Sequence, residues 1–128
     1  MPFALWSILI AAVLPLVWTV IAKAGAPYNN HCPRQVLEAA TGYRQRANWA
    51  QQNAWEAFAP YAAAMIIAWQ MHVPLEQLNG VAAIFIAARV VHGILYLSDQ
   101  ATWRSLVWFV GLGSVVYLFV LAASSGVK

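Results

Sequence analysis

Charge is scarce in this sequence. Only 9% of its 128 residues are Asp, Glu, Lys or Arg, whereas 62% are hydrophobic, which is far too apolar for a water-soluble domain of this size. The net charge of +3 is not gathered into a basic patch, so nucleic acid is not an expected partner. Seven Trp and five Tyr residues suit the two interfacial belts of a bilayer. The composition therefore predicts an integral membrane protein.

Cysteine is almost absent as well. Cys32 is the only one, so no disulfide can form within the chain. A single cysteine does not indicate whether the protein resides in an oxidising or a reducing compartment. The neighbouring His31 has no second ligand pair at the spacing that metal sites use. We therefore expect no metal centre.

Long apolar runs divide the chain. Residues 1–22 carry no charge and are long enough to cross a bilayer. A cleaved signal peptide would begin with basic residues, but the nearest base, Lys23, follows the apolar run. Further apolar runs cover residues 47–71, 81–98 and 105–123. Because short turns join the last three, the pattern predicts a single all-α membrane domain, a four-helix up-down bundle.

The longest polar connection covers residues 23–46. Within it, Pro33 predicts the start of a short helix and Gly42 its end. Five of the seven basic residues lie in this connection or beside the third one, namely Lys23, Arg34, Arg44, Arg46 and Arg104. The opposite side has only Lys128. The positive-inside rule then places the 23–46 loop in the cytosol and both termini outside it.

Two of the spans carry polar residues on one helical face. Asn53 and Glu56 are three residues apart in the second span. Arg89, His92 and Tyr96 follow at i, i+3 and i+7 in the third. At a rise of ~1.5 Å per residue, Glu56 matches Arg89 in depth, and the asparagine matches the histidine. Because charged groups in a bilayer usually face a partner or a cavity, we expect these side chains to form one cluster that opens to the cytosol.

Each of these residues also has a purely structural explanation. Glu56 and Arg89 could form a buried ion pair that only fixes the helix register. Asn53 could bridge two helices, and Arg104 could be an interfacial cation. His92 alone is more often a hydrogen-bonded core histidine than a functional one. What favours a functional site is the common depth of these groups.

Three short motifs occur in this cluster: Asn53-x-x-Glu56, Arg89-x-x-His92-x-x-x-Tyr96 and Arg104-Ser105. Taken together they resemble the MAPEG family, the membrane-associated proteins in eicosanoid and glutathione metabolism, and most of all an uncharacterised bacterial branch of it. The resemblance covers all four spans. It implies a homotrimer in the bacterial inner membrane, glutathione as co-substrate between neighbouring protomers, and a lipophilic small molecule or lipid that arrives through the bilayer.

The resemblance also implies site residues. Positions matching Asn53, Glu56, Tyr96 and Arg104 contact glutathione in family enzymes, and the position matching His92 lies in the same pocket. We add Arg46 and Arg89 to the expected glutathione-binding residues because of their charge and position. Those expected to act in catalysis are Arg104 and Ser105. In family enzymes an arginine matching Arg104 is credited with holding the glutathione thiolate. A serine matching Ser105 is proposed to assist in the prostaglandin E synthase. Arg46 would pair with a carboxylate of the peptide, and Glu56 would accept a hydrogen bond from its α-amino group.

The expected reaction depends on the guanidinium of Arg104. A free thiol has a pKa near ~8.5, and a nearby guanidinium lowers it, which raises the thiolate fraction at neutral pH. Arginine suits this task because it stays protonated. The thiolate could then attack an electrophilic carbon or reduce a lipid hydroperoxide. The expected function is therefore a glutathione-dependent transferase or peroxidase for lipophilic electrophiles.

Two departures from the family pattern leave another function open. Several glutathione-using members have an arginine four residues before the motif asparagine, where this chain has Trp49. Another member has an arginine just before that asparagine, where this chain has Gln52. Because glutathione carries two carboxylates, the loss of these cations favours a non-catalytic lipid-binding or scaffold protein of the same family.

A small multidrug transporter is a minor alternative. Such transporters are also four-helix chains of similar length with one essential membrane carboxylate. Their carboxylate lies in the first span, however, and the first span of this chain has none.

Overall fold

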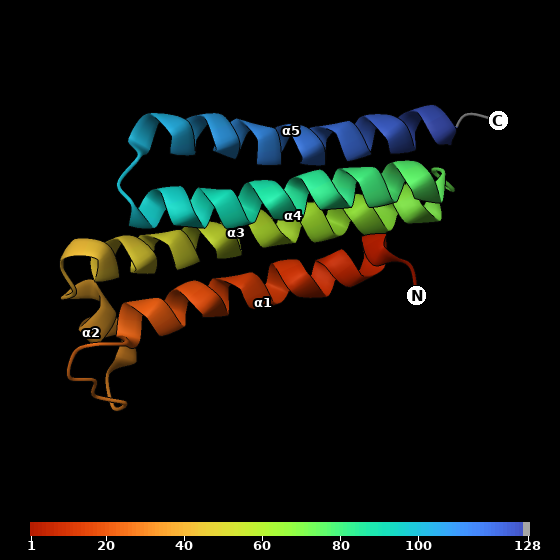
Figure 1. The fold of residues 1–128 in the computed structure, drawn as a ribbon. Helices are drawn as coiled ribbons and strands as arrows, with labels where there is room; N and C mark the ends of the chain where they lie inside the picture. The colour runs from red at the N-terminus through yellow and green to blue at the C-terminus, as the bar shows by residue number, and fades with distance from the viewer. Residues whose placement is uncertain (127–128) are drawn as a thin grey trace.

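The computed structural model describes residues 1–126 and is helical, with no strand in that part of the chain (Figure 1). Its five helices are α1 (Phe3–Lys23), α2 (Pro33–Glu38), α3 (Gly42–Gln70), α4 (Leu75–Leu97) and α5 (Ala101–Ser125). The four long helices lie alongside one another and alternate in direction (Figure 1). The predicted all-α class is confirmed. Lys128, on which the predicted orientation partly depends, lies outside the described residues.

Three of the helices, α1, α4 and α5, are long and apolar enough to cross a membrane. Their length and composition support the predicted integral membrane protein. The longest helix, α3, is not among them, although it contains the second predicted span. Its first half carries a series of amides and one carboxylate, namely Asn48, Gln51, Gln52, Asn53 and Glu56, which lower its hydropathy. A crossing by α3 therefore stays a prediction.

The short helix α2 lies in the predicted 23–46 connection. It begins at Pro33 as predicted, because proline has the backbone angle of a first helical turn and needs no N–H donor there. The predicted end at Gly42 is wrong, since α2 already ends at Glu38 and Gly42 begins α3. With φ of 64°, Gly42 has a left-handed conformation that other residues rarely adopt, which suits it to a sharp change of direction.

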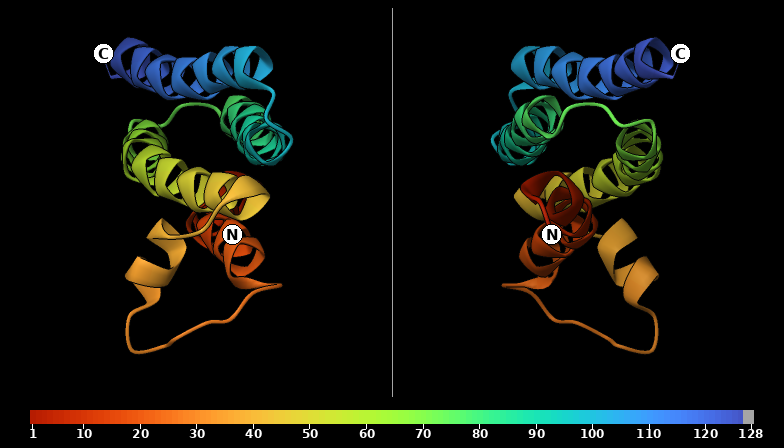
Figure 2. Two further views of the ribbon diagram at one scale, coloured as in Figure 1. Left: turned by 90° about the vertical axis from the view of Figure 1, so that its left-hand side faces the viewer. Right: turned by 90° about the vertical axis from the view of Figure 1, so that its right-hand side faces the viewer.

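The helices α3 and α4 form the middle of the bundle. Seen along the helices, α1 and α5 lie on opposite sides of this pair (Figure 2). The main hydrophobic core fills the half of the bundle that is remote from α2. At its centre the Tyr61 and Phe85 rings stack in parallel with centroids 3.7 Å apart, and the Tyr61 hydroxyl hydrogen-bonds Ser7 of α1. Arg89, His92 and Tyr96 lie towards the other half, the end that carries α2.

One close approach joins α1 to α4. The buried Trp18 side chain lies directly on the backbone of Gly93, where an added Cβ would be only 2.0 Å from Trp18 Cζ2. Small residues allow helices in membranes to pack this closely, which maximises van der Waals contact where no hydrophobic force holds the helices together. Glycine at this position is therefore a packing requirement.

We predict that Gly93→Ala destabilises the protein, because the indole would have to move out of its site. The cost expected for overpacking is about 1–3 kcal/mol, seen as a lower melting temperature of the detergent-solubilised protein. Gly80→Ala is the matched control on α4, since nothing lies within 4 Å of a Cβ built at Gly80. Equal melting temperatures for the two variants would contradict this account of the α1–α4 contact.

Candidate functional site

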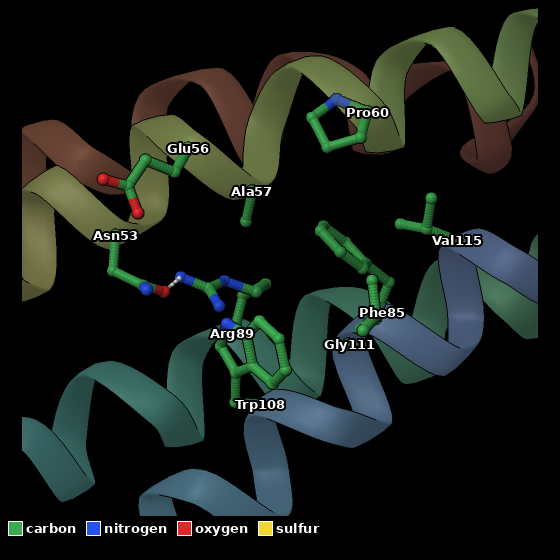
Figure 3. Close-up of a pocket in the computed structure, with 10 residues that line it drawn as sticks. Asn53, Glu56, Ala57, Pro60, Phe85, Arg89, Trp108, Gly111 and Val115 are labelled. Atoms are coloured by element: carbon green, nitrogen blue, oxygen red, sulfur yellow. Dashed lines mark hydrogen bonds between the residues drawn. The ribbon is translucent and has the colours of Figure 1, made fainter.

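A buried guanidinium lies at the centre of the polar half. Arg89 of α4 is only 5% exposed, and its Nη2 donates a hydrogen bond of 2.7 Å to Asn53 Oδ1 of α3 (Figure 3). The buried ion pair of Glu56 with Arg89, one of the explanations considered above, does not form among the described residues. Glu56 is exposed, and its carboxylate lies beside Asn53 on the same side of α3 (Figure 3). Equal depth did not amount to contact.

A second group of side chains surrounds Tyr96, near the end of α4. The His92 and Tyr96 rings meet edge to face, with centroids 5.7 Å apart. From α5, the guanidinium carbon of Arg104 lies 4.2 Å from the centre of the tyrosine ring, a cation–π contact. From α3, the Trp49 ring lies 6.4 Å away. Tyr96 is therefore the contact that joins α3, α4 and the start of α5 at this end of the bundle.

His92 has an unsatisfied ring nitrogen. The residue is 3% exposed, and its buried Nδ1 has no hydrogen-bond partner among residues 1–126. A buried polar atom left without a partner costs about 1–3 kcal/mol, so native proteins rarely tolerate one without a reason. The description of His92 as an ordinary hydrogen-bonded core histidine does not fit this environment.

The other predicted site residues lie at the edge of this region. Arg46 Nε donates a 3.1 Å hydrogen bond to the carbonyl of Leu97, one of the last carbonyls of α4, which no helix N–H can satisfy. Ser105 follows Arg104 on α5 and is exposed. The structure thus forms two groups, in which Asn53 contacts Arg89, and both His92 and Arg104 contact Tyr96. Ser105 belongs to neither group.

A cavity of about 170 Å³ opens beside Arg89, between α3, α4 and α5 (Figure 3). Its lining consists of three polar residues and seven others: Asn53, Glu56, Arg89, Ala57, Pro60, Phe85, Trp108, Gly111, Leu112 and Val115. Sequence reasoning found the polar three and missed the α5 wall. Gly111 leaves open the space above the Arg89 side chain, but Gly113 on the same apolar helix borders no cavity, so a glycine there was not a sufficient signal.

The comparisons with known proteins give one result. The model of the MAPEG family matches residues 3–124, which is nearly the whole chain. No curated protein and no solved structure matches the chain.

We predict that Asn53→Ala lowers the free energy of unfolding by about 1–3 kcal/mol, because it removes the acceptor of a charge-assisted hydrogen bond inside the bundle. Asn53→Asp keeps an oxygen at the same place and should retain more of the stability. Thermal unfolding of the two variants in detergent measures the difference. An alanine variant as stable as the parent would show that Arg89 does not depend on Asn53.

Proposed function

The chain belongs to the MAPEG family, which is associated with membranes and with glutathione and eicosanoid metabolism, and on this premise we propose that it is a glutathione-dependent transferase or peroxidase for lipophilic electrophiles or lipid hydroperoxides. The observation that carries this proposal is the contact of Arg104 with Tyr96, because it fixes a guanidinium beside a buried polar cluster. In the proposed reaction this guanidinium holds the glutathione thiolate.

The polar groups fit the charges of glutathione. The peptide carries two carboxylates, one ammonium group and one thiol. Arg46 keeps guanidinium N–H groups beyond the one bonded to Leu97, and these would bind a carboxylate. The exposed carboxylate of Glu56 would accept a hydrogen bond from the ammonium group. Asn53, Arg89, His92 and Tyr96 would line the site between them.

The thiolate is the reactive species in either reaction. An adjacent guanidinium stabilises it and so lowers the pKa of the bound thiol below its usual ~8.5. The ring of Tyr96 restricts the Arg104 side chain, so less motion remains to be lost when the thiolate binds. Ser105, the next residue, would assist as a hydrogen-bond donor to the thiolate or to the co-substrate.

A homotrimer would complete the site. Glu56 is exposed on α3, and a carboxylate that faces lipid costs about 2.5–3.5 kcal/mol at the centre of a membrane helix. A neighbouring protomer that covers this face would remove the cost and bring the bound glutathione between the two chains. We therefore propose three copies per assembly, each a four-helix up-down bundle.

We place this assembly in the bacterial inner membrane with both termini outside the cytosol. The arrangement of the helices supports this orientation, because five basic residues gather at the end that carries α2: Lys23, Arg34, Arg44, Arg46 and Arg104. The positive-inside rule puts that end in the cytosol, where a soluble peptide could reach the site.

A non-catalytic lipid-binding or scaffold protein is the second candidate. The observation that favours it is Trp49, which is 42% exposed and packs against Tyr96 at a position where several glutathione-using members have an arginine. An exposed indole at this place would bind a lipid better than it would bind a carboxylate of glutathione.

We predict that the folded, oligomeric protein gives a saturable ultraviolet thiolate signal when titrated with glutathione at pH 7. Arg104→Ala should lose this signal and regain thiolate only as the pH rises towards the ~8.5 of a free thiol. Lys23→Ala removes a cation at the end of α1, stacked over Tyr28, and should keep the signal. An unchanged signal in Arg104→Ala would refute the role of this residue. No signal at millimolar glutathione would favour the second candidate.

A further inference from the structure

A groove lies between the short helix α2 and the first half of α3. Leu37 of α2 packs against Ala22 of α1 and Ala47 of α3, which holds α2 in place beside these two helices. The groove has a volume of about 380 Å³ and shares none of its described lining residues with the cavity beside Arg89. Besides Leu37, its lining consists of Arg34, Glu38, Asn48, Gln51, Gln52 and Trp55. The groove is therefore a separate polar site, which the proposed reaction does not use.

The two charged groups of the groove have opposite signs. Arg34 and Glu38 are four residues apart on α2, a spacing at which opposite charges on a helix often pair. Here no ion pair joins them, and neither side chain has a hydrogen-bond partner among residues 1–126. The groove thus presents a cation and an anion about one turn apart, which complements a ligand that carries both charges.

Asn48 adds a buried hydrogen-bond donor. The residue is only 4% exposed, and its Oδ1 accepts a 2.9 Å hydrogen bond from Gln51 Nε2. Gln51 Oε1 in turn accepts a 2.7 Å hydrogen bond from Thr19 of α1. This chain of bonds uses the oxygen of the asparagine and leaves its amide N–H groups as the remaining donors. A buried donor that lines a groove calls for an acceptor, such as a phosphate oxygen.

The groove lies at the level of a bilayer surface. The uncharged run of α1 ends at Ala22, which packs against Ala47, one residue before Asn48. Figure 1 shows α2 at this same end of the bundle, beside the end of α1 and the start of α3. Trp55 follows Asn48 by seven residues, a rise of ~10 Å towards the middle of the bundle, and is 44% exposed. An exposed indole at this depth is typical of the membrane interface.

We propose that this groove binds the headgroup of an aminophospholipid, a membrane lipid with a phosphate and a primary ammonium group. The phosphate accepts hydrogen bonds from Arg34 and from the Asn48 amide, and the ammonium group donates to Glu38. The glycerol and the acyl chains leave the groove along the exposed indole of Trp55. The bound headgroup thereby joins α2 to α3. This inference is independent of the glutathione reaction.

The charges of the groove distinguish this lipid from related ones. Phosphatidylglycerol has the phosphate but no cation, so Glu38 would stay without a partner. Phosphatidylcholine has both charges, but its nitrogen carries three methyl groups and no N–H, so it cannot donate a hydrogen bond to the carboxylate. Preference for a primary ammonium group is therefore the property that identifies the site.

Binding can be measured on the delipidated, detergent-solubilised protein with three lipids that have identical acyl chains: phosphatidylethanolamine, phosphatidylcholine and phosphatidylglycerol. We expect phosphatidylethanolamine to raise the melting temperature in a saturable way. The other two lipids should bind about tenfold more weakly. Equal affinities for the three would overturn the proposal, because lipid that merely surrounds the helices does not distinguish these headgroups.

Three variants assign the selectivity to the groove. Glu38→Gln removes the group that selects the ammonium, so it should weaken phosphatidylethanolamine binding about tenfold without weakening phosphatidylglycerol binding. Arg34→Gln should weaken the binding of all three lipids, because each carries a phosphate. Glu76→Gln is the matched control, since it changes an exposed carboxylate in the first turn of α4 and should leave lipid binding unchanged. An undiminished preference for phosphatidylethanolamine in Glu38→Gln would overturn the proposal.

Two soluble compounds test the source of the ligand. O-Phosphoethanolamine has the same headgroup without glycerol or acyl chains, and equal stabilisation by it would replace the lipid with a soluble phosphoamine. Glutathione also carries a carboxylate and an ammonium group, and displacement of the lipid by glutathione would assign the groove to the peptide instead. We expect neither result. Because the thiolate signal is measured separately with Arg104→Ala, failure of the lipid site leaves the proposed function standing, and loss of the thiolate signal leaves the lipid site standing.

Discussion

A guanidinium enclosed by apolar helices has to be held by a partner, and in this protein that partner is an amide. The hydrogen bond from Arg89 to Asn53 fixes α4 against α3 at the level where the hydrophobic core gives way to the polar half. Because Asn53 accepts through a single oxygen, the remaining N–H groups of the guanidinium stay available. The cavity exists beside this pair because Gly111 of α5 contributes no side chain there.

Much of the architecture could be predicted from the sequence, because the forces that determine it are local. Uncharged runs of sufficient length become helices, and Pro33 starts the short one. Helical spacing also placed Asn53 and Arg89 at nearby depths. What spacing cannot give is which of two side chains on one face reaches a partner once the helices pack. In the packed structure Asn53 is the hydrogen-bond partner of Arg89, and Glu56 stays exposed.

The α5 wall of the cavity could not be predicted for a different reason. Apolar residues that line a pocket and apolar residues that face lipid obey the same pattern, so nothing distinguished Trp108 or Leu112 from their neighbours. Of the contacts of Tyr96, spacing predicted the one with His92, four residues earlier on α4. Those with Trp49 of α3 and Arg104 of α5 come from other helices, and only the packed structure shows that they meet on one ring.

The double contact of Phe85 limits how this protein can evolve. One face of its ring stacks on Tyr61 in the core, and the same side chain borders the cavity. A change at Phe85 that reshaped the cavity would loosen the core as well, so selection for foldedness would remove it. Trp108 and Leu112 line the cavity from α5 and are not part of the main hydrophobic core, so changes there would not loosen it. Divergence in ligand preference among descendants of this chain should therefore accumulate on α5.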